Sequence, residues 1–399
     1  MALARRMAGF AGSPTLKVSA IARALRAQGR DVVDFGSGEP DFDTPDNIKQ
    51  AAIQAILEGH TKYTTPSGTD DLKDAIVSKL LHENHLAYTR EQIVVSCGAK
   101  HTLHNLAQVL FDPGDEVILP SPYWTSYDTL IRMAGAEPII IRTTEEEGFR
   151  VSPEMVEHRL TPRTKAIILN SPSNPTGSMY TSDELAAIAA LAIKHRIYVI
   201  ADDIYEKIVF DGQAHTSIIQ LMQEAQEFGI LVNGFSKTFA MTGWRLGYAA
   251  GPREIVTAMG DYQSQTTSNP NSIAQRAGIE ALRGQQKSVA TMVQEFELRR
   301  NYVIERLNAM EGVTCFKPMG AFYAFPNVSA TFGKYSPSGL ITDASTFTEH
   351  LLQTSGVAVV PGEAFGDHRC IRLSFATSME QLHTGLDRIE QFAKGLQTH

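Results

Sequence analysis

Cysteine is scarce in this chain, and its three residues form no metal-binding pattern. Cys97, Cys315 and Cys370 lie far apart among 399 residues, outside any CxxC or Cys/His spacing. An odd number of scattered cysteines is typical of reduced thiols rather than of a disulfide framework. The sequence therefore predicts a cytoplasmic protein with no metal site.

Long apolar runs and an excess of positive charge are also missing. The longest apolar run, 185–193, is far shorter than the ~20 residues that a membrane-spanning helix needs. The net charge is −8, and acidic and basic residues are interspersed, which argues against a nucleic-acid-binding surface. We expect neither a membrane span nor a nucleic-acid partner.

Acidic residues are absent from the first thirty positions, which contain six arginines and lysines. This composition occurs in organelle transit peptides. The apolar spacing of residues 19–26 equally fits an amphipathic helix that packs on the protein. We favour the packed helix.

The centre of the chain alternates between short apolar runs and helical patterns. Predicted strands lie at 93–97, 116–119, 138–141, 166–169, 198–201, 230–232 and 246–250, and predicted helices at 46–57, 70–83, 101–110, 182–195 and 272–282. Alternating βα units favour an α/β fold with a mostly parallel sheet between two layers of helices. We place this large domain at 48–290.

Beyond the alternation, a long charged helix is expected at 287–310. Mixed elements follow it, with strands at 313–316, 321–325, 357–360 and 371–375, a helix at 344–355 and a final helix from 380. Strands and helices in this order favour a smaller α+β domain. We predict that residues 1–47 and 291–399 form it.

A lysine follows one of the predicted strands at the point where ligands collect in α/β folds. Ligands bind at the carboxyl ends of parallel strands, and Lys237 comes shortly after the strand at 230–232. A single lysine is most often a surface residue whose stem lies along apolar side chains. The alternative is an amine nucleophile that forms a Schiff base with a carbonyl group.

Other strand ends also carry polar groups. Gly98 and Ala99 open a helix after the strand at 93–97, and such a start offers backbone N–H groups to a phosphate. Asn174 lies in a proline-rich turn, and Asp202 and Tyr205 follow the strand at 198–201. Each has an ordinary structural explanation, so only their combination indicates a site.

Pyridoxal phosphate is the cofactor that needs this combination. Its aldehyde requires a lysine, and Asp202 can keep its ring nitrogen protonated because buried opposite charges favour each other. Tyr205 and Asn174 can donate to the ring oxygen. Trp124 can lie flat on the ring, or it can be a buried structural tryptophan.

The sequence resembles the class I aminotransferases of pyridoxal-phosphate fold type I over nearly its whole length. Within them it is similar to the bacterial-type aspartate aminotransferases, some of which also use prephenate. The resemblance is carried by GEPDFDTP at 38–45, KYT at 62–64, GAK at 98–100, NSPSNPTG at 170–177, DDIY at 202–205, SKTFAMTGWRLG at 236–247, VVPGEAF at 359–365 and IRLS at 371–374.

The resemblance implies a role for each matching residue. Lys237 matches the Schiff-base lysine that later acts as base and acid, and Arg245 matches the arginine that binds the phosphate. Arg372 matches the arginine that forks onto the substrate α-carboxylate, and Gly38 matches a backbone contact to the same group. Tyr63 matches a tyrosine that reaches the neighbouring subunit's phosphate, which implies a homodimer with shared active sites.

Three further positions bear on phosphate binding and substrate choice. Many relatives carry a serine three residues before the lysine as a phosphate ligand, whereas this chain has Gly234 there, so Ser236 is the candidate substitute. The lysine matching Lys100 is implicated in holding a second substrate carboxylate, and it could also be a solvent-exposed residue. The threonine matching Thr15 is associated with prephenate use.

The resemblance therefore implies an aminotransferase that moves an amino group between aspartate or glutamate and a 2-oxo acid. Prephenate is an alternative amino acceptor. A lyase that cleaves a C–S bond with the same lysine is a second alternative, and a non-catalytic regulatory module on this fold is a third. The complete set of lysine, aspartate and arginine favours an enzyme over the regulatory module.

Overall fold

The computed structural model describes residue 12 and residues 14–398. Its first helix, α1 (Pro14–Ala27), includes the segment for which we expected an amphipathic helix. The composition that also fits a transit peptide extends over residues 1–11, which lie outside the described residues. In the described chain, no helix has both the length and the apolar character needed to cross a membrane.

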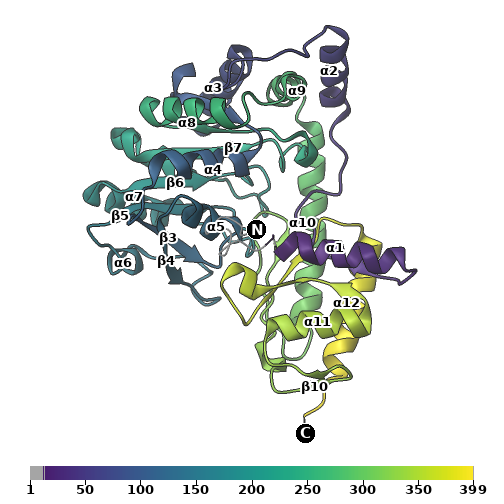
Figure 1. Ribbon diagram of the computed structural model, residues 1–399. Helices are drawn as coiled ribbons and strands as arrows, with labels where there is room; N and C mark the ends of the chain where they lie inside the picture. The colour runs from purple at the N-terminus through teal and green to yellow at the C-terminus, as the bar shows by residue number, and fades with distance from the viewer. Residues whose placement is uncertain (1–11, 13, 399) are drawn as a thin grey trace, which may run out of the picture.

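A seven-stranded sheet forms the centre of the larger part of the molecule (Figure 1). Its strands run in the order β2-β8-β7-β6-β5-β3-β4. The bounds are β2 (Ile93–Ser96), β3 (Glu116–Ser121), β4 (Glu137–Arg142), β5 (Thr164–Asn170), β6 (Tyr198–Asp202), β7 (Gly229–Gly234) and β8 (Gly247–Ala250). Only β8 runs antiparallel to its neighbours, which confirms the mostly parallel sheet.

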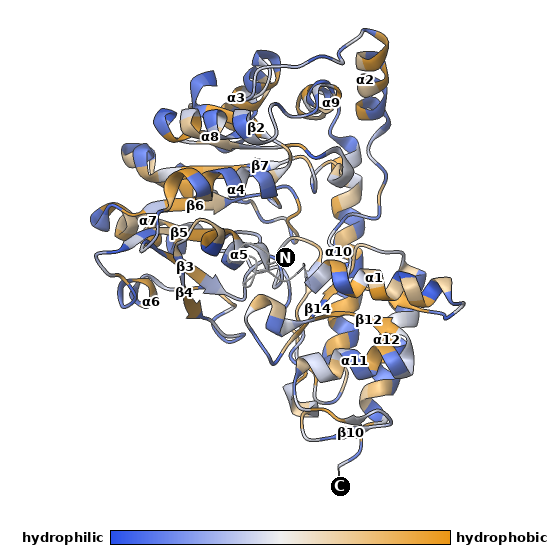
Figure 2. Ribbon diagram, viewed as in Figure 1, coloured by the Kyte–Doolittle hydropathy of each residue, from blue (hydrophilic) through white to orange (hydrophobic). Residues whose placement is uncertain are grey.

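Successive side chains of each strand serve two different cores, because they point to opposite faces of the sheet. Leu231 packs with α3 (Asp70–Asn84), α7 (Ser182–His195) and α9 (Ser272–Arg283). Its neighbours Ile230 and Val232 pack with the helices of the other face, α4 (Ala99–Leu110), α5 (Ser126–Met133) and α8 (Arg253–Thr266). Figure 2 shows the apolar strands between helices whose outer faces are polar.

Helix starts and ends follow local capping chemistry. The hydroxyl of Thr181 accepts from the Glu184 amide, and the Glu184 side chain reaches back to Thr181, so α7 begins as a capping box. The helix ends where Arg196 adopts a left-handed φ of 54°. The helices expected at 46–57 and 182–195 have these bounds in α2 (Asp46–Leu57) and α7, whereas α5, α6 (Pro153–Glu157) and α8 had no sequence-based prediction.

The long helix α10 (Lys287–Asn308) runs from the large sheet toward a second group of elements (Figure 1). That group contains α11 (Ala344–Ser355), α12 (Met379–Lys394), and the three-stranded sheet β13 (Val360–Pro361), β14 (Ile371–Ser374) and β9 (Tyr323–Ala324). A separate hairpin joins β10 (Tyr335–Ser336) and β11 (Gly339–Leu340). Near the N-terminus, β1 (Val33–Asp34) pairs in parallel with β12 (Val357–Ala358).

The strand expected at 313–316 is wrong. Only Thr314 makes a bridge there, to Asn327. The side chain of Asn308 accepts from the Cys315 amide and donates to the Cys315 carbonyl, so it uses the backbone groups that a strand would need. The side chain of Asn308, at the end of α10, therefore takes the hydrogen bonds that a neighbouring strand would otherwise make.

Candidate active site

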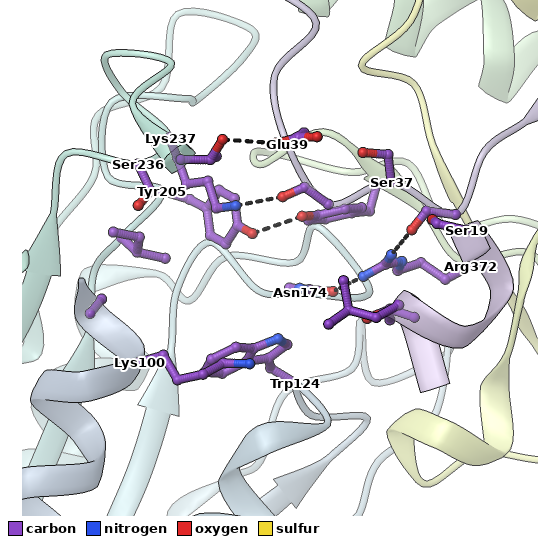
Figure 3. Close-up of a pocket in the computed structure, with 18 of the residues that line it drawn as sticks. Ser19, Ser37, Glu39, Lys100, Trp124, Asn174, Tyr205, Ser236, Lys237 and Arg372 are labelled. Carbon is purple, nitrogen blue, oxygen red and sulfur yellow. Dashed lines mark hydrogen bonds between the residues drawn. The ribbon is translucent and has the colours of Figure 1, made fainter. Parts of the chain in front are cut away.

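A cavity of about 500 Å³ lies where the carboxyl ends of the sheet strands face α1 and β14 (Figure 3). Most of the predicted site residues line it: Thr15, Gly38, Ala99, Lys100, Trp124, Asn174, Asp202, Tyr205, Ser236, Lys237, Arg245 and Arg372. Two predicted residues, Gly98 and Tyr63, are not in the lining.

Lys237 follows β7, and its side-chain amine projects into the cavity. Its Nζ donates a hydrogen bond to the carbonyl of Gly38, as Figure 3 shows. Burial lowers the pKa of Lys237 to about 8, although the Glu39 carboxylate opposes this shift. A substantial fraction of this amine is therefore neutral, and hence nucleophilic, just above neutral pH.

Asp202 ends β6 as a buried carboxylate, 3% exposed. Its Oδ2 accepts from the Tyr127 hydroxyl at 2.6 Å, and its Oδ1 accepts from the Ile204 amide at 3.3 Å. Burial raises the pKa of Asp202 to about 6, while these two donors lower it. A cationic N–H in the cavity would give Oδ1 a stronger partner than the long amide contact.

Tyr205 and Asn174 point toward the cavity from two neighbouring strand ends. The hydroxyl of Tyr205 lies 2.9 Å from that of Tyr323. Asn174 accepts from Arg372 through Oδ1, so its side-chain amide nitrogen keeps its protons for another acceptor. Asn170 ties this turn to Asp202, because its side chain donates to the Asp202 carbonyl and accepts from the Asn174 amide.

Arg372 is a buried cation that is only partly satisfied. From β14 it donates to Asn174 Oδ1 at 3.1 Å and to the Gly36 carbonyl at 2.7 Å. Its guanidinium lies 4.5 Å from the ring centre of Tyr323 and 5.0 Å from that of Phe365. Among the described residues Arg372 has no carboxylate partner, and its Nε makes no hydrogen bond. Such a group is suited to an incoming carboxylate.

The start of α4 and Arg245 together form an anion-binding corner. Gly98 has a φ of 91°, and a Cβ at this position would collide with the Arg245 guanidinium. The glycine therefore lets the arginine lie against the helix N-terminus, although Gly98 itself does not line the cavity. The amides of Ala99 and Lys100 precede the first hydrogen bonds of the helix and are free to bind an anion.

Lys100 and Trp124 lie together at another side of the cavity (Figure 3). The Lys100 Nζ is 5.0 Å from the centre of the Trp124 ring, which is a cation–π distance. In the described chain no acidic group acts on Lys100, and burial and Arg245 lower its pKa. Thr15 reaches the same cavity from α1.

Tyr63 lies outside its own chain's cavity and is 89% exposed. Three further apolar side chains of the adjacent helix α2 are also exposed, namely Ile53, Ile56 and Leu57. This apolar surface carries no obvious role in a single chain.

Several residues of the site had no predicted role, and three of them interact with predicted residues. Tyr127 bonds Asp202, Tyr323 contacts both Tyr205 and Arg372, and Glu39 accepts from the Thr242 hydroxyl beside Lys237. Tyr127 could have been found, because its spacing from Trp124 places both on one side of a helical turn. Tyr323 offered no such signal, since its partners are far away in sequence.

The arrangement fits pyridoxal phosphate. The partly satisfied Asp202 carboxylate suits a ring N–H, and the corner at Arg245 suits a phosphate. The amide protons of Asn174 and the hydroxyl of Tyr205, which shares a hydrogen bond with Tyr323, suit a ring oxygen. Lys237 supplies an amine that is partly neutral. Arg372 lines the cavity as a cation, which suits a substrate carboxylate.

Comparisons with known proteins show which family this chain belongs to. The family model for aminotransferase class I and II matches residues 30–389. An aspartate/prephenate aminotransferase of Cereibacter sphaeroides is 48% identical over 96% of both chains. The crystal structure of the aspartate aminotransferase of Rhizobium meliloti superposes with a TM-score of 0.96 at 43% identity, covering both chains completely. The aspartate aminotransferase of Thermus thermophilus with maleate superposes with a TM-score of 0.92 at 42% identity, covering 98% of this chain and 100% of its own.

Proposed function

We propose that this chain, which belongs to the class I and II aminotransferases, moves the amino group between aspartate or glutamate and a 2-oxo acid such as 2-oxoglutarate or oxaloacetate. Transamination with pyridoxal phosphate is the activity of its family. The choice of a dicarboxylic substrate is the specific part of the proposal. It rests on two cationic side chains at different sides of one cavity, Arg372 and Lys100.

When bound, pyridoxal phosphate supplies an aldehyde that condenses with amines and a ring that accepts electrons. In the proposal, Asp202 holds the ring nitrogen, while Asn174 and Tyr205 hold the ring oxygen. Trp124 covers the ring face, and Arg245 with the start of α4 holds the phosphate. Ser236, which lines the same cavity, is a candidate for a further phosphate contact.

Arg372 would bind the substrate α-carboxylate as a fork, with Gly38 close by. Asn174 and the Gly36 carbonyl fix the plane of the Arg372 guanidinium, so little orientation remains to be lost when a carboxylate binds. The Lys237 Nζ would then carry the proton that leaves and re-enters the substrate, because its lowered pKa lets it both accept and donate near neutral pH.

Lys100 supports a substrate with a second carboxylate. Its cation faces the cavity without an acidic partner, so a neutral amino acid would leave it unpaired. The Thermus relative with maleate, a dicarboxylate, is consistent with this preference. Prephenate is the second candidate substrate, since Thr15 and Lys100 both line the cavity and the Cereibacter relative is named for it.

A homodimer with shared sites completes the proposal. Tyr63 and the apolar side chains of α2 are exposed, and a second copy of the chain would cover them and receive Tyr63 at its phosphate corner. We also propose a cytoplasmic location, in keeping with three free cysteines. The division into a large domain at 48–290 and a small domain from 1–47 and 291–399 stays a prediction.

An amino-donor panel tests the substrate choice. Aspartate, glutamate, phenylalanine and alanine are offered with 2-oxoglutarate and with prephenate, and kcat/KM is measured for each pair. We expect aspartate and glutamate to exceed alanine and phenylalanine by at least about tenfold, which corresponds to one charge-assisted contact. Equal values for all four donors would contradict the role of Lys100.

The lyase alternative gives different products. A C–S lyase would convert cysteine or cystathionine to pyruvate, ammonia and the sulfide or thiol, and it would need no 2-oxo acid as a second substrate. We expect no such release, and we expect aspartate alone to convert the bound cofactor to its pyridoxamine form. If ammonia were released as fast as the amino acid is consumed, the protein would be a lyase rather than an aminotransferase.

A further inference from the structure

Tyr127 links the carboxylate at the end of β6 to the aromatic wall of the cavity. It lies in the first turn of α5 and is 2% exposed. Its hydroxyl donates to Asp202 Oδ2 at 2.6 Å, and its ring meets that of Trp124 edge to face, with centres 5.3 Å apart and an angle of 83°. One side chain therefore touches both groups proposed to contact the cofactor ring.

We propose that Tyr127 is a positioning residue that holds Asp202 Oδ2, so that Oδ1 is presented to the ring nitrogen of pyridoxal phosphate as the open acceptor. The proposal rests on the proposed role of Asp202. It adds a residue to which neither the sequence nor the comparisons gave a role.

The two oxygens of Asp202 have unequal partners in the described structure. Oδ2 has a short bond from a hydroxyl, whereas Oδ1 has only the Ile204 amide at 3.3 Å. A carboxylate with one oxygen fixed cannot rotate freely about its last bond. A ring N–H that enters the cavity therefore meets Oδ1.

The Tyr127 hydroxyl also favours the charged form of the carboxylate. A phenol next to a carboxylate oxygen is the donor of the hydrogen bond, because the ionised carboxylate only accepts. Burial raises the pKa of Asp202, and the bond from Tyr127 is the largest opposing effect. Without it the buried carboxyl would more readily be neutral, and the ring nitrogen would more readily lose its proton.

The location of Tyr127 makes this role specific among the nearby tyrosines. Tyr123 lies in the same segment and is only partly buried, and in the described chain its hydroxyl makes no hydrogen bond to Asp202. Tyr123→Phe is therefore a matched control that removes one phenol hydroxyl from the same segment. Tyr127→Phe removes the hydroxyl and keeps the ring against Trp124.

The test compares pyridoxal phosphate with the analogue that has a carbon in place of the ring nitrogen. The dissociation constant of each cofactor is measured by absorbance titration of the cofactor-free protein, and kcat is measured for aspartate. With pyridoxal phosphate, Tyr127→Phe should weaken binding and lower kcat by about ten- to a hundredfold, as expected for a lost bond to a charged group. With the analogue, wild type and Tyr127→Phe should have equal dissociation constants.

Two outcomes would overturn the proposal. If Tyr127→Phe loses the same affinity for both cofactors, Tyr127 contributes only to packing. If it loses affinity for neither, the Tyr127 hydroxyl does not contribute to cofactor binding. If the wild type itself binds both cofactors equally, the proposed role of Asp202 fails, and that failure is seen before any Tyr127 variant is made. Tyr123→Phe should match wild type throughout.

Placing 3-fluorotyrosine at 127 covers the case in which Tyr127→Phe does not fold. The fluorinated phenol keeps the hydroxyl and is a stronger donor, so the affinity for pyridoxal phosphate should rise while that for the analogue stays unchanged. Weaker binding of pyridoxal phosphate by this variant would contradict the proposal.

Discussion

Arg372 on β14 donates to Asn174 Oδ1 at 3.1 Å, across 198 positions of sequence. The bond joins the three-stranded sheet to the turn that follows β5 of the large sheet. It aims the Arg372 guanidinium at the cavity and turns the Asn174 amide nitrogen toward it.

The fork of Arg372 should not be replaceable by a point charge. Arg372→Lys keeps the charge but loses the planar donors to Asn174, Gly36 and a carboxylate. We expect KM for aspartate to rise by about tenfold or more, with one or more charge-assisted bonds lost. Arg369→Lys is the control, since Arg369 is paired with Asp367. An unchanged KM for Arg372→Lys would remove the arginine from the proposed carboxylate site.

Lys237→Ala should remove the proton carrier. We expect turnover of aspartate to fall by about a hundred- to ten-thousandfold, the usual contribution of a positioned acid–base group. Lys207→Ala is the control, because Lys207 pairs with Glu83 at the surface. The measurement is kcat with saturating cofactor. Full turnover by Lys237→Ala would rule out the mechanism.

Cofactor uptake should depend on the ionisation of Lys237. The pKa of Lys237 is lowered to about 8, so the neutral, reactive fraction of the amine increases as pH rises through that value. We expect the rate of pyridoxal phosphate uptake by the cofactor-free protein to rise about fivefold from pH 7 to 8, and less than twofold from 8 to 9. A tenfold rise per pH unit that continues past pH 9 would indicate a lysine of ordinary pKa.

Lys79 and Glu206 form a buried ion pair beside β7, the strand that precedes Lys237. Both are less than 10% exposed, and Asn84 and Asn233 also donate to Glu206. Lys79→Met should lower the free energy of unfolding by about 3–5 kcal/mol because it leaves a buried charge, and Lys79→Met with Glu206→Leu should recover much of this loss. Lys207→Met, which breaks the exposed pair with Glu83, should cost at most about 1 kcal/mol.

The same pair makes the free energy of unfolding depend on pH in the acidic range. Burial raises the pKa of Glu206, but Lys79 and the other partners outweigh it and lower the value to about 2, from an ordinary 4.5. The folded state therefore gains stability from this group above the ordinary value and loses it as pH falls from 4.5 toward 2. Urea unfolding of wild type and Glu206→Gln over this range should show a difference that shrinks with falling pH. A constant difference would contradict the assignment.

Mixed dimers test the proposed sharing of sites. Tyr63→Ala and Lys237→Ala should each be impaired alone. After mixing and exchange of subunits, half of the dimers are hybrids with one intact site each, so activity should return to about a quarter of wild type. No recovery in verified hybrids would show that Tyr63 does not serve the partner's site.

Local patterns along the chain were enough to predict many of its helices and strands. The alternation of strands and helices predicted the mostly parallel sheet, because side chains that are buried on both faces make continuous apolar runs. The helical pattern at 182–195 predicted α7 with its observed bounds. The motifs around Lys237 and Arg372 pointed to the family, because a cofactor with several functional groups demands several matched partners.

The contacts between distant residues, in contrast, depend on how the elements pack. Tyr127 bonds Asp202, and Tyr323 contacts Tyr205 and Arg372, through bonds and ring contacts between segments distant in sequence. The prediction of a strand at 313–316 was wrong for the same reason, since the Asn308 side chain forms hydrogen bonds with the backbone of Cys315. A pattern along the chain encodes which face of an element is buried, whereas the partner that a polar group finds depends on how the elements pack.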